Sequence, residues 1–138
     1  IAQPTQLLCR SALALDIWVA SSVVPAAKTQ FPGDAVTAFR HASTYVCRSR
    51  NNVDGAKISE HAKGNAIDIR SLTFSDGTSV EMLPRMKDGS VTGAFQRTVS
   101  AAACLYFTTV LSPGSDATYQ DHMHLDVIKR NSGYRYCR

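Results

Sequence analysis

The sequence lacks several features that mark common classes of protein. Its four cysteines form no C-x-x-C pair, which excludes the usual structural zinc knuckle. No apolar run reaches the ~20 residues of a membrane span, because polar residues interrupt both of the longest runs, at residues 13–24 and 101–110. Neither a repeat nor a low-complexity tract occurs. These absences leave an ordinary globular chain with no membrane span in this segment.

Charge of either sign is also modest. Fifteen Lys and Arg against eleven Asp and Glu give a formal net charge of +4, which favours an anionic partner. The basic residues are scattered along the sequence and form neither a stripe nor a stacked aromatic platform, so we expect no nucleic-acid binding. A polyanionic polymer of the cell envelope fits this charge equally well.

Length and apolar content predict one globular domain, residues 1–138, around a single core. An even number of widely spaced cysteines predicts two disulfides and an oxidising compartment, so we expect a periplasmic or secreted protein. Three pairings are possible. We expect Cys9 with Cys47 and Cys104 with Cys137, since this pairing ties each chain end to a nearby element. Because the chain begins with Ile1 rather than Met, we expect a processed piece of a longer precursor.

Hydrophobic periodicity predicts the elements. In a helix over residues 11–24, Leu13, Ile17, Ala20 and Val24 recur at helical spacing and should face the core, with Ser11 as N-cap and Pro25 beyond the end. A second helix is predicted over residues 94–107. Strands are predicted over residues 35–48, 65–74, 79–83 and 119–128, with a hairpin turn at 75–78. Strands in hairpins with helices outside them predict an α+β fold with a mainly antiparallel sheet and flanking helices.

Two short segments, residues 59–68 and 121–126, carry the candidate chemistry. Three of the four histidines of the chain fall in them, in company with carboxylates. Imidazole and carboxylate are the ligands of catalytic zinc, which takes three protein ligands and keeps a fourth position open. The sequence therefore predicts a Zn²⁺ site on the face of the sheet, divided between two distant segments.

The spacing of these residues fits such a site. His61 and Asp68 are seven apart with Gly64 between them, which suits a loop that runs into a strand. In the second segment, period-two alternation places His122, His124 and Asp126 on one strand face. The intervening apolar residues, Met123, Leu125 and Val127, then face the core.

These residues resemble known signatures. Ser59-x-His61-x-x-Gly64-x-Ala66-x-Asp68 resembles the first metal signature of the metallopeptidase group that contains lysostaphin, the D-Ala-D-Ala peptidases and the Hedgehog signalling domain. The pair His122-x-His124 resembles its second signature. The whole chain resembles the extensin-like C-terminal domain family of bacterial proteins, also through Tyr45-x-Cys47-Arg48 and the closing Cys137-Arg138. The resemblance implies a zinc peptidase fold that acts on bacterial peptidoglycan.

The resemblance also implies roles for individual residues. His61, Asp68 and His124 match the metal ligands. His122 matches the histidine that lies beside the metal, and Asp121 stands where the D-Ala-D-Ala peptidases carry a glutamate, so the two are rival general bases. We favour His122, because on a regular strand it points to the same side as His124 whereas Asp121 points away.

Other residues take supporting roles. Arg48 resembles the arginine that stabilises the oxyanion in D-Ala-D-Ala peptidases, and a guanidinium there could also hold a substrate carboxylate. Ser59 is expected to hydrogen-bond substrate or to cap its loop, and Asp126 to orient a metal-bound histidine. Glu60 and Lys63 are interpreted as solvated loop charges, and His41 as a structural or surface histidine.

The sequence thus predicts a zinc-dependent peptidase that hydrolyses an amide bond in the stem peptide or cross-link of peptidoglycan, at a D,D or an L,D bond. The alternative is a non-catalytic zinc module that binds cell-wall peptide or a protein partner. Both histidines of the H-x-H pair and Asp121 are present, which favours the enzyme.

Overall fold

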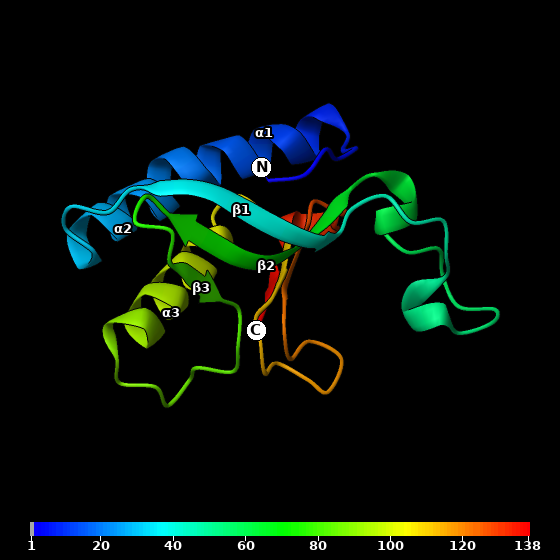
Figure 1. The fold of residues 1–138 in the computed structure, drawn as a ribbon. Helices are drawn as coiled ribbons and strands as arrows, with labels where there is room; N and C mark the ends of the chain where they lie inside the picture. The colour runs from blue at the N-terminus through cyan, green and yellow to red at the C-terminus, as the bar shows by residue number, and fades with distance from the viewer. Residues whose placement is uncertain (1) are drawn as a thin grey trace.

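A continuous helical rod runs along one side of a sheet in this structure, a computed structural model that describes residues 2–138 (Figure 1). The rod consists of α1 (Cys9–Trp18), a π-helical turn η1 (Val19–Val23) and α2 (Val24–Gln30). Pro25 lies in the first turn of α2, directly after the π-helical turn, rather than beyond the helix end. No helix within residues 2–138 combines the length and the hydrophobicity that crossing a membrane requires.

The prediction of which face of this rod is buried is wrong. Leu13, Ile17 and Val24 are 59%, 39% and 44% exposed, whereas Leu15 and Trp18 are buried. The indole N–H of Trp18 donates to the carbonyl of Val99 at 3.0 Å, so this large side chain anchors the rod against the body. The next buried positions are Val23 and Ala27. The step from Trp18 to Val23 is five residues long because it crosses the π-helical turn, and regular 3.6-residue spacing does not predict it.

The beginning of the rod also differs from the expected one. Leu8 occupies the N-cap position of α1 and its side chain makes no capping hydrogen bond. Ser11, the expected N-cap, is buried inside the helix. The cap preference of serine was therefore misleading here, because the N-cap lies three residues earlier than the pattern suggested.

The sheet has six strands: β1 (Val36–Ser43), β2 (Ala66–Phe74), β3 (Ser79–Glu81), β4 (Thr109–Leu111), β5 (Met123–Asp126) and β6 (Tyr136–Cys137). Its order is β1-β2-β5-β4-β6, with β3 paired to β2. Every pair is antiparallel except β4 with β6. The expected mixed α+β fold is confirmed, although β4 and β6 were not predicted as strands.

Core packing decides which face of the sheet is left for chemistry. Helix α3 (Val91–Ala103) begins where Ser90 Oγ accepts the N–H of Gly93, and its Phe95 ring lies 5.2 Å from Phe31 and 5.8 Å from Phe74. Met123 and Leu125 of β5 belong to the same core. Because side chains alternate along a strand, the residue between them points to the opposite face of the sheet.

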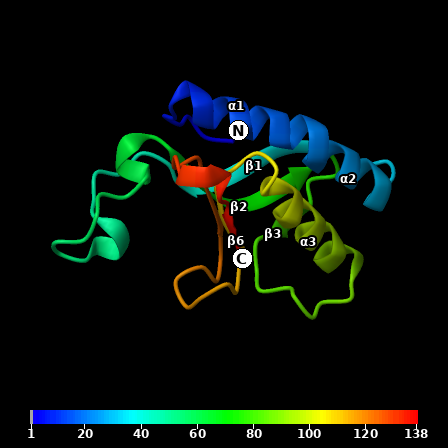
Figure 2. The same ribbon diagram turned by 180° about the vertical axis from the view of Figure 1, so that it is seen from behind.

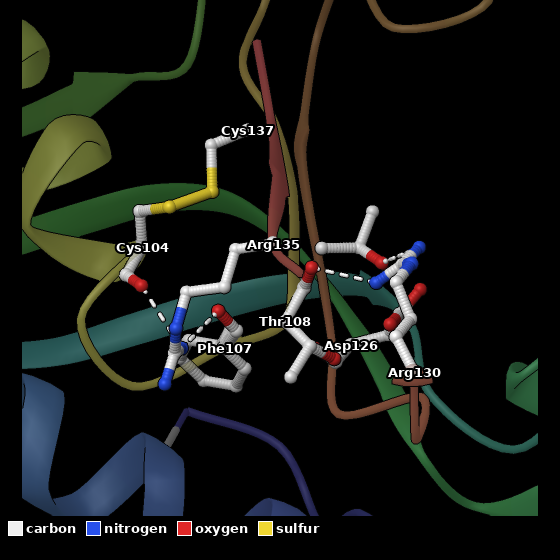
Figure 3. Close-up of a disulfide and its surroundings, with 8 residues drawn as sticks. Cys104, Phe107, Thr108, Asp126, Arg130, Arg135 and Cys137 are labelled. Carbon is white, nitrogen blue, oxygen red and sulfur yellow. Dashed lines mark hydrogen bonds between the residues drawn. A yellow bond between two sulfur atoms is a disulfide. The ribbon is translucent and has the colours of Figure 1, made fainter. Parts of the chain in front are cut away.

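The C-terminal tail is fastened to the body rather than free. The expected Cys104–Cys137 disulfide is present and joins the end of α3 to β6 (Figure 3). Beside it, the guanidinium of Arg135 donates to the carbonyls of Cys104 and Phe107, and that of Arg130 donates to the carbonyl of Thr108 (Figure 3). These bonds hold β6 against β4.

The prediction of a second disulfide, between Cys9 and Cys47, is wrong. Cys9 and Cys47 are both free and exposed. Cys9 is the first residue of α1, and Cys47 lies in the irregular segment after β1. Each side chain faces solvent on its own segment, so tying a chain end to a nearby element was not a sufficient guide to pairing.

Candidate metal centre

Three of the predicted site residues meet at one end of the central strands. His61 is the first residue of a 3₁₀ turn, η3 (His61–Lys63), Asp68 lies on β2, and His124 lies on β5. Asp68 and His124 are register partners across the β2–β5 pair. This pairing fixes both side chains on one face of the sheet. The loop that carries His61 then adds the third side chain of the cluster.

A glycine allows that loop to enter β2 directly. Gly64 ends η3 in the left-handed region, at φ +67°, where residues with a Cβ are strained. The carbonyl of Gly64 accepts the backbone N–H of Leu8 at 2.9 Å, and a Cβ at this position would lie 3.4 Å from Leu8 atoms. The N-terminal segment therefore packs directly on the turn that positions His61.

The candidate ligand atoms are close together. His61 Nε2 lies 3.2 Å from His124 Nδ1 and 3.3 Å from Asp68 Oδ2, and His124 Nδ1 lies 2.9 Å from Asp68 Oδ1. All three residues are buried. One ligand atom from each lies within 4.8 Å of the others, so the cluster could hold a metal ion.

The outer hydrogen bonds of the two imidazoles test whether this donor set fits a metal. His61 Nδ1 donates to the carbonyl of Thr44 at 2.6 Å, and His124 Nε2 donates to Asp126 Oδ2 at 3.0 Å. Each ring therefore donates a hydrogen bond from its outer nitrogen and turns the other nitrogen toward the cluster. This is the arrangement that fixes the tautomer of metal-binding histidines, so the donor set fits a metal ion.

Electrostatics couple the members of the cluster. Burial alone would lower the pKa of His124, but hydrogen bonds with Asp126 and Asp68 raise this pKa to about 9. Burial would raise the pKa of Asp68, yet hydrogen bonds from His124 and His61 hold it well below its usual range. Positive charge is thus strongly favoured at the centre of the cluster.

The two rival bases occupy different surroundings. His122 Nε2 lies 4.0 Å from Asp68 Oδ1, on the side of the cluster, and His122 Nδ1 lies 3.0 Å from Asp121 Oδ1. The other oxygen of Asp121 pairs with Arg70 Nη2 at 3.0 Å. Hydrogen bonding with His122 is the main cause that lowers the pKa of Asp121. Asp121 therefore bonds to the back of His122 and does not face the cluster.

Tyr119 is a neighbour of the site that the sequence did not reveal. Its ring centroid lies 5.3 Å from that of His122 and 5.8 Å from that of His124. Burial raises the pKa of Tyr119, as do the charges of Asp68 and Asp116, with Arg48 opposing them. The phenol therefore stays protonated at neutral pH and can donate a hydrogen bond. From the sequence, Tyr119 is only the first residue of the strand predicted over residues 119–128, whereas β5 begins at Met123.

A cavity of about 720 Å³ opens onto the cluster, and its lining includes Arg48, Ser59, Tyr119, His122 and Asp126 as well as the three candidate ligands. Its walls come from the segment before η3 and the segment before β5. Both segments project from the body of the fold, as the front and back views show (Figures 1 and 2). Tyr134, Tyr136 and Arg138 of the fastened tail line it too. The cavity gives an extended ligand access to the cluster.

The supporting residues differ in their contacts. The Arg48 guanidinium makes no hydrogen bond or ion pair within residues 2–138 and is free to bind a ligand. Ser59 Oγ accepts the backbone N–H of His61 at 3.3 Å, so it caps the loop. Glu60 is buried, not solvated as expected, and accepts hydrogen bonds from Lys63 Nζ and Asn65 Nδ2, both at 2.8 Å. These contacts give Glu60 a structural role.

Comparison with known proteins gives one finding. The family model described as extensin-like protein C-terminus matches residues 1–138. No curated protein and no solved structure matches the chain.

Proposed function

The chain belongs to the family of extensin-like protein C-termini, and on that premise we propose that it is a zinc-dependent peptidase, periplasmic or secreted. Its substrate is an amide bond in the stem peptide or cross-link of peptidoglycan. The observation that carries the proposal is the buried cluster of His61, Asp68 and His124, in which each imidazole bonds an acceptor through its outer nitrogen and turns its other nitrogen toward Asp68. The resemblance of residues 59–68 and 121–126 to zinc peptidase signatures supports it.

These three residues would hold the ion and leave its remaining coordination open toward the cavity. When bound, zinc polarises the scissile carbonyl and lowers the pKa of a water molecule. Burial of the ligands keeps the surroundings at low dielectric, where a fixed charge acts most strongly. The chain's other residues then have to orient the substrate and move one proton.

His122 is placed to move that proton. Because its Nδ1 bonds Asp121, its Nε2 is the free acceptor, and this nitrogen lies on the cluster side at 4.0 Å from Asp68 Oδ1. His122 would take a proton from the attacking water and give it to the leaving amine, which typically contributes about 10²–10⁴-fold to rate. Asp121 would orient the ring rather than act as the base.

Arg48 and Tyr119 are the donors available to the oxygen of the scissile carbonyl. Both line the cavity, the guanidinium of Arg48 is unpaired within residues 2–138, and the phenol of Tyr119 is held in its protonated form. Donors that are fixed before the reaction stabilise the charge that develops on this oxygen. The Cys104–Cys137 disulfide supports the extracytoplasmic location, because disulfides persist in oxidising compartments.

Mass spectrometry of purified muropeptides incubated with the zinc-loaded chain tests the proposal. We expect one peptide bond to be cut, no cutting after chelation, and recovery when zinc is returned. His122→Ala should lose at least a hundredfold in turnover yet keep stoichiometric zinc, whereas Asp68→Ala, the matched control, should lose zinc as well.

Two outcomes would contradict the proposal. Muropeptides of both D,D and L,D linkage that bind but stay uncut would identify a binding module instead. Loss of zinc from His122→Ala would show that His122 is a ligand, and the ligand set would have to include both histidines of the H-x-H pair.

A further inference from the structure

A second cavity, of about 600 Å³, lies beside the metal-site cavity and is strongly basic. One acidic residue, Glu60, lines it, against five basic residues from separate segments: Arg10, Arg50, Lys57, Lys63 and Lys129. Five of the fifteen basic residues of the chain thus gather in one place. These five residues are scattered along the sequence and come together only in the fold.

Most of this charge is not neutralised by the protein itself. Glu60 is already bonded to Lys63 and Asn65, and Arg10 donates two hydrogen bonds to Asn65 Oδ1, at 3.1 and 2.7 Å. Among the described residues, the side chains of Arg50, Lys57 and Lys129 make no ion pair or hydrogen bond. Three cationic groups therefore face this cavity without a partner.

The basic cavity continues the metal-site cavity. Arg50 and Glu60 line both. The backbone N–H of Arg50 donates to the carbonyl of Lys57 at 2.9 Å, and that of Ser59 to the carbonyl of Arg48 at 3.1 Å, so this loop is held as a short ladder. Its turn carries Asn51 and Asn52 in the left-handed region, at φ 52° and 57°. The ladder fixes Arg50 at the boundary between the two cavities.

The cavity also has an apolar component. Ile58 and Ile128 line it beside the basic residues, and Ile58 is 62% exposed. Aliphatic side chains next to unpartnered ammonium and guanidinium groups suit a ligand that has a carbon stem ending in a carboxylate. A peptide with acidic side chains has this chemistry, whereas a neutral glycan does not.

We propose that the basic cavity is a binding site for the free carboxylates of a peptidoglycan peptide, at a distance from the bond that is cut. The site rests on the proposed function, because it assigns the ligand of the basic cavity to the same substrate. It makes the protein selective for peptides whose carboxylates are free over peptides in which they are amidated.

Cosedimentation with peptidoglycan sacculi stripped of phosphate-bearing polymers tests this site. The zinc-loaded chain carries His122→Ala throughout, so that the sacculi stay intact. Lys57→Gln/Lys129→Gln should bind about tenfold more weakly and with a smaller dependence on salt, since two ionic contacts are lost. Lys28→Gln/Lys87→Gln, the matched control, removes the same charge from exposed positions outside the cavity and should bind as the parent does. Sacculi amidated chemically at their carboxylates should bind the parent about as weakly as the double variant.

Three results would overturn the site: equal losses in the variant and its control, an unaffected variant, or tight binding to amidated sacculi. The muropeptide assay separates this inference from the proposed function. If a Lys57- and Lys129-dependent binding persists while no muropeptide is cut, the peptidase assignment fails and the site stands. If muropeptides are cut while binding ignores both substitutions and amidation, the site fails and the peptidase assignment stands.

Discussion

The two histidines of the candidate metal centre offer the same atom type to the cluster but are supported differently. His124 lies on β5, between β2 and β4, and its outer N–H bonds the carboxylate of Asp126. His61 begins a 3₁₀ turn, and its outer N–H bonds a neutral backbone carbonyl, that of Thr44. One imidazole is oriented by a charge within a sheet and the other by a loop backbone.

This difference indicates a division of labour. A carbonyl fixes the orientation and tautomer of a ring, but a carboxylate also makes the ring a stronger base and compensates its charge. We infer that the β5 side sets the affinity and proton balance of the site, while the His61 loop completes the coordination. Substitutions on the two sides of the cluster test this contrast.

Removal of either imidazole should abolish stoichiometric zinc binding, but only one removal should also weaken the fold. His124→Ala leaves the buried carboxylate of Asp126 without its partner, and such a loss costs roughly 3–5 kcal/mol. His61→Ala frees the carbonyl of Thr44 and removes one of the two imidazoles beside Asp68, which keeps its bond to His124, so the metal-free variant should lose less. Denaturant unfolding of the metal-free proteins measures this, and equal losses would remove the contrast between the two histidines.

Substitution of the residue that bonds the outer nitrogen of each histidine should change zinc affinity for His124 but not for His61. Asp126→Asn keeps the shape but removes the charge, and we expect zinc to bind about 10–100-fold more weakly. Thr44→Ala is the control, because it leaves the backbone carbonyl in place and should bind zinc like the parent. Competition with a chelator of known affinity gives both values. A large effect of Thr44→Ala would mean that the loop, not Asp126, tunes the site.

Zinc binding near neutral pH should release about one proton, from His124. In the metal-free protein the pKa of His124 is raised from 6.5 to about 9, so the ring is protonated at pH 7.5 and Nδ1 has to lose its proton to bind a metal. The same shift stabilises the metal-free fold fully below about pH 6.5, and this contribution is lost as the pH rises through about 9. The depressed pKa of Asp68 acts in the opposite sense, so its contribution is lost in acid.

Titration calorimetry in buffers of different ionisation enthalpy counts the released protons. Asp126→Asn is again the informative variant, since it replaces one of the two carboxylates that raise the pKa of His124 by a neutral amide. It should release fewer protons at pH 7.5. Equal release from parent and variant would show that Asp126 does not control the charge of this ring.

The smallest effect is expected beside the ligands rather than among them. Arg70 pairs with Asp121, and both side chains are about half exposed, so the pair contributes at most about 1 kcal/mol. Arg70→Gln should lower turnover a few-fold with unchanged zinc content, by loosening the support of His122. Asp121→Asn should lower turnover more than Arg70→Gln, because it changes the hydrogen bond to the ring itself. A reversed order would separate Arg70 from the support of His122.

Local patterns were sufficient where neighbours in sequence are also neighbours in the fold. The alternation in residues 122–127 predicted that Met123 and Leu125 are buried in the core, and the 75–78 turn predicted the hairpin of β2 and β3. The spacing of His61 and Asp68 indicated a loop that runs into a strand, which is the local structure around both residues.

Local patterns failed where distant contacts decide. Trp18 anchors the rod on one side, so Leu13 and Ile17 face solvent, and the π-helical turn then moves the next buried position to Val23. Whether Cys9 and Cys47 form a disulfide depends on their positions in space, and the structure leaves both free. Tyr119, Arg70 and the basic cavity depend on contacts between separate segments, none of which leaves a periodic signal.

The distance along the chain between the two ligand histidines has a kinetic consequence. His61 and His124 are 63 residues apart, so the cluster cannot form until the β2–β5 pairing has closed a long loop, which is a slow step. A metal that needs both histidines gains most of its binding energy after the rate-limiting step of folding. We therefore expect zinc to lengthen the lifetime of the folded protein by slowing unfolding, while the folding rate itself hardly changes.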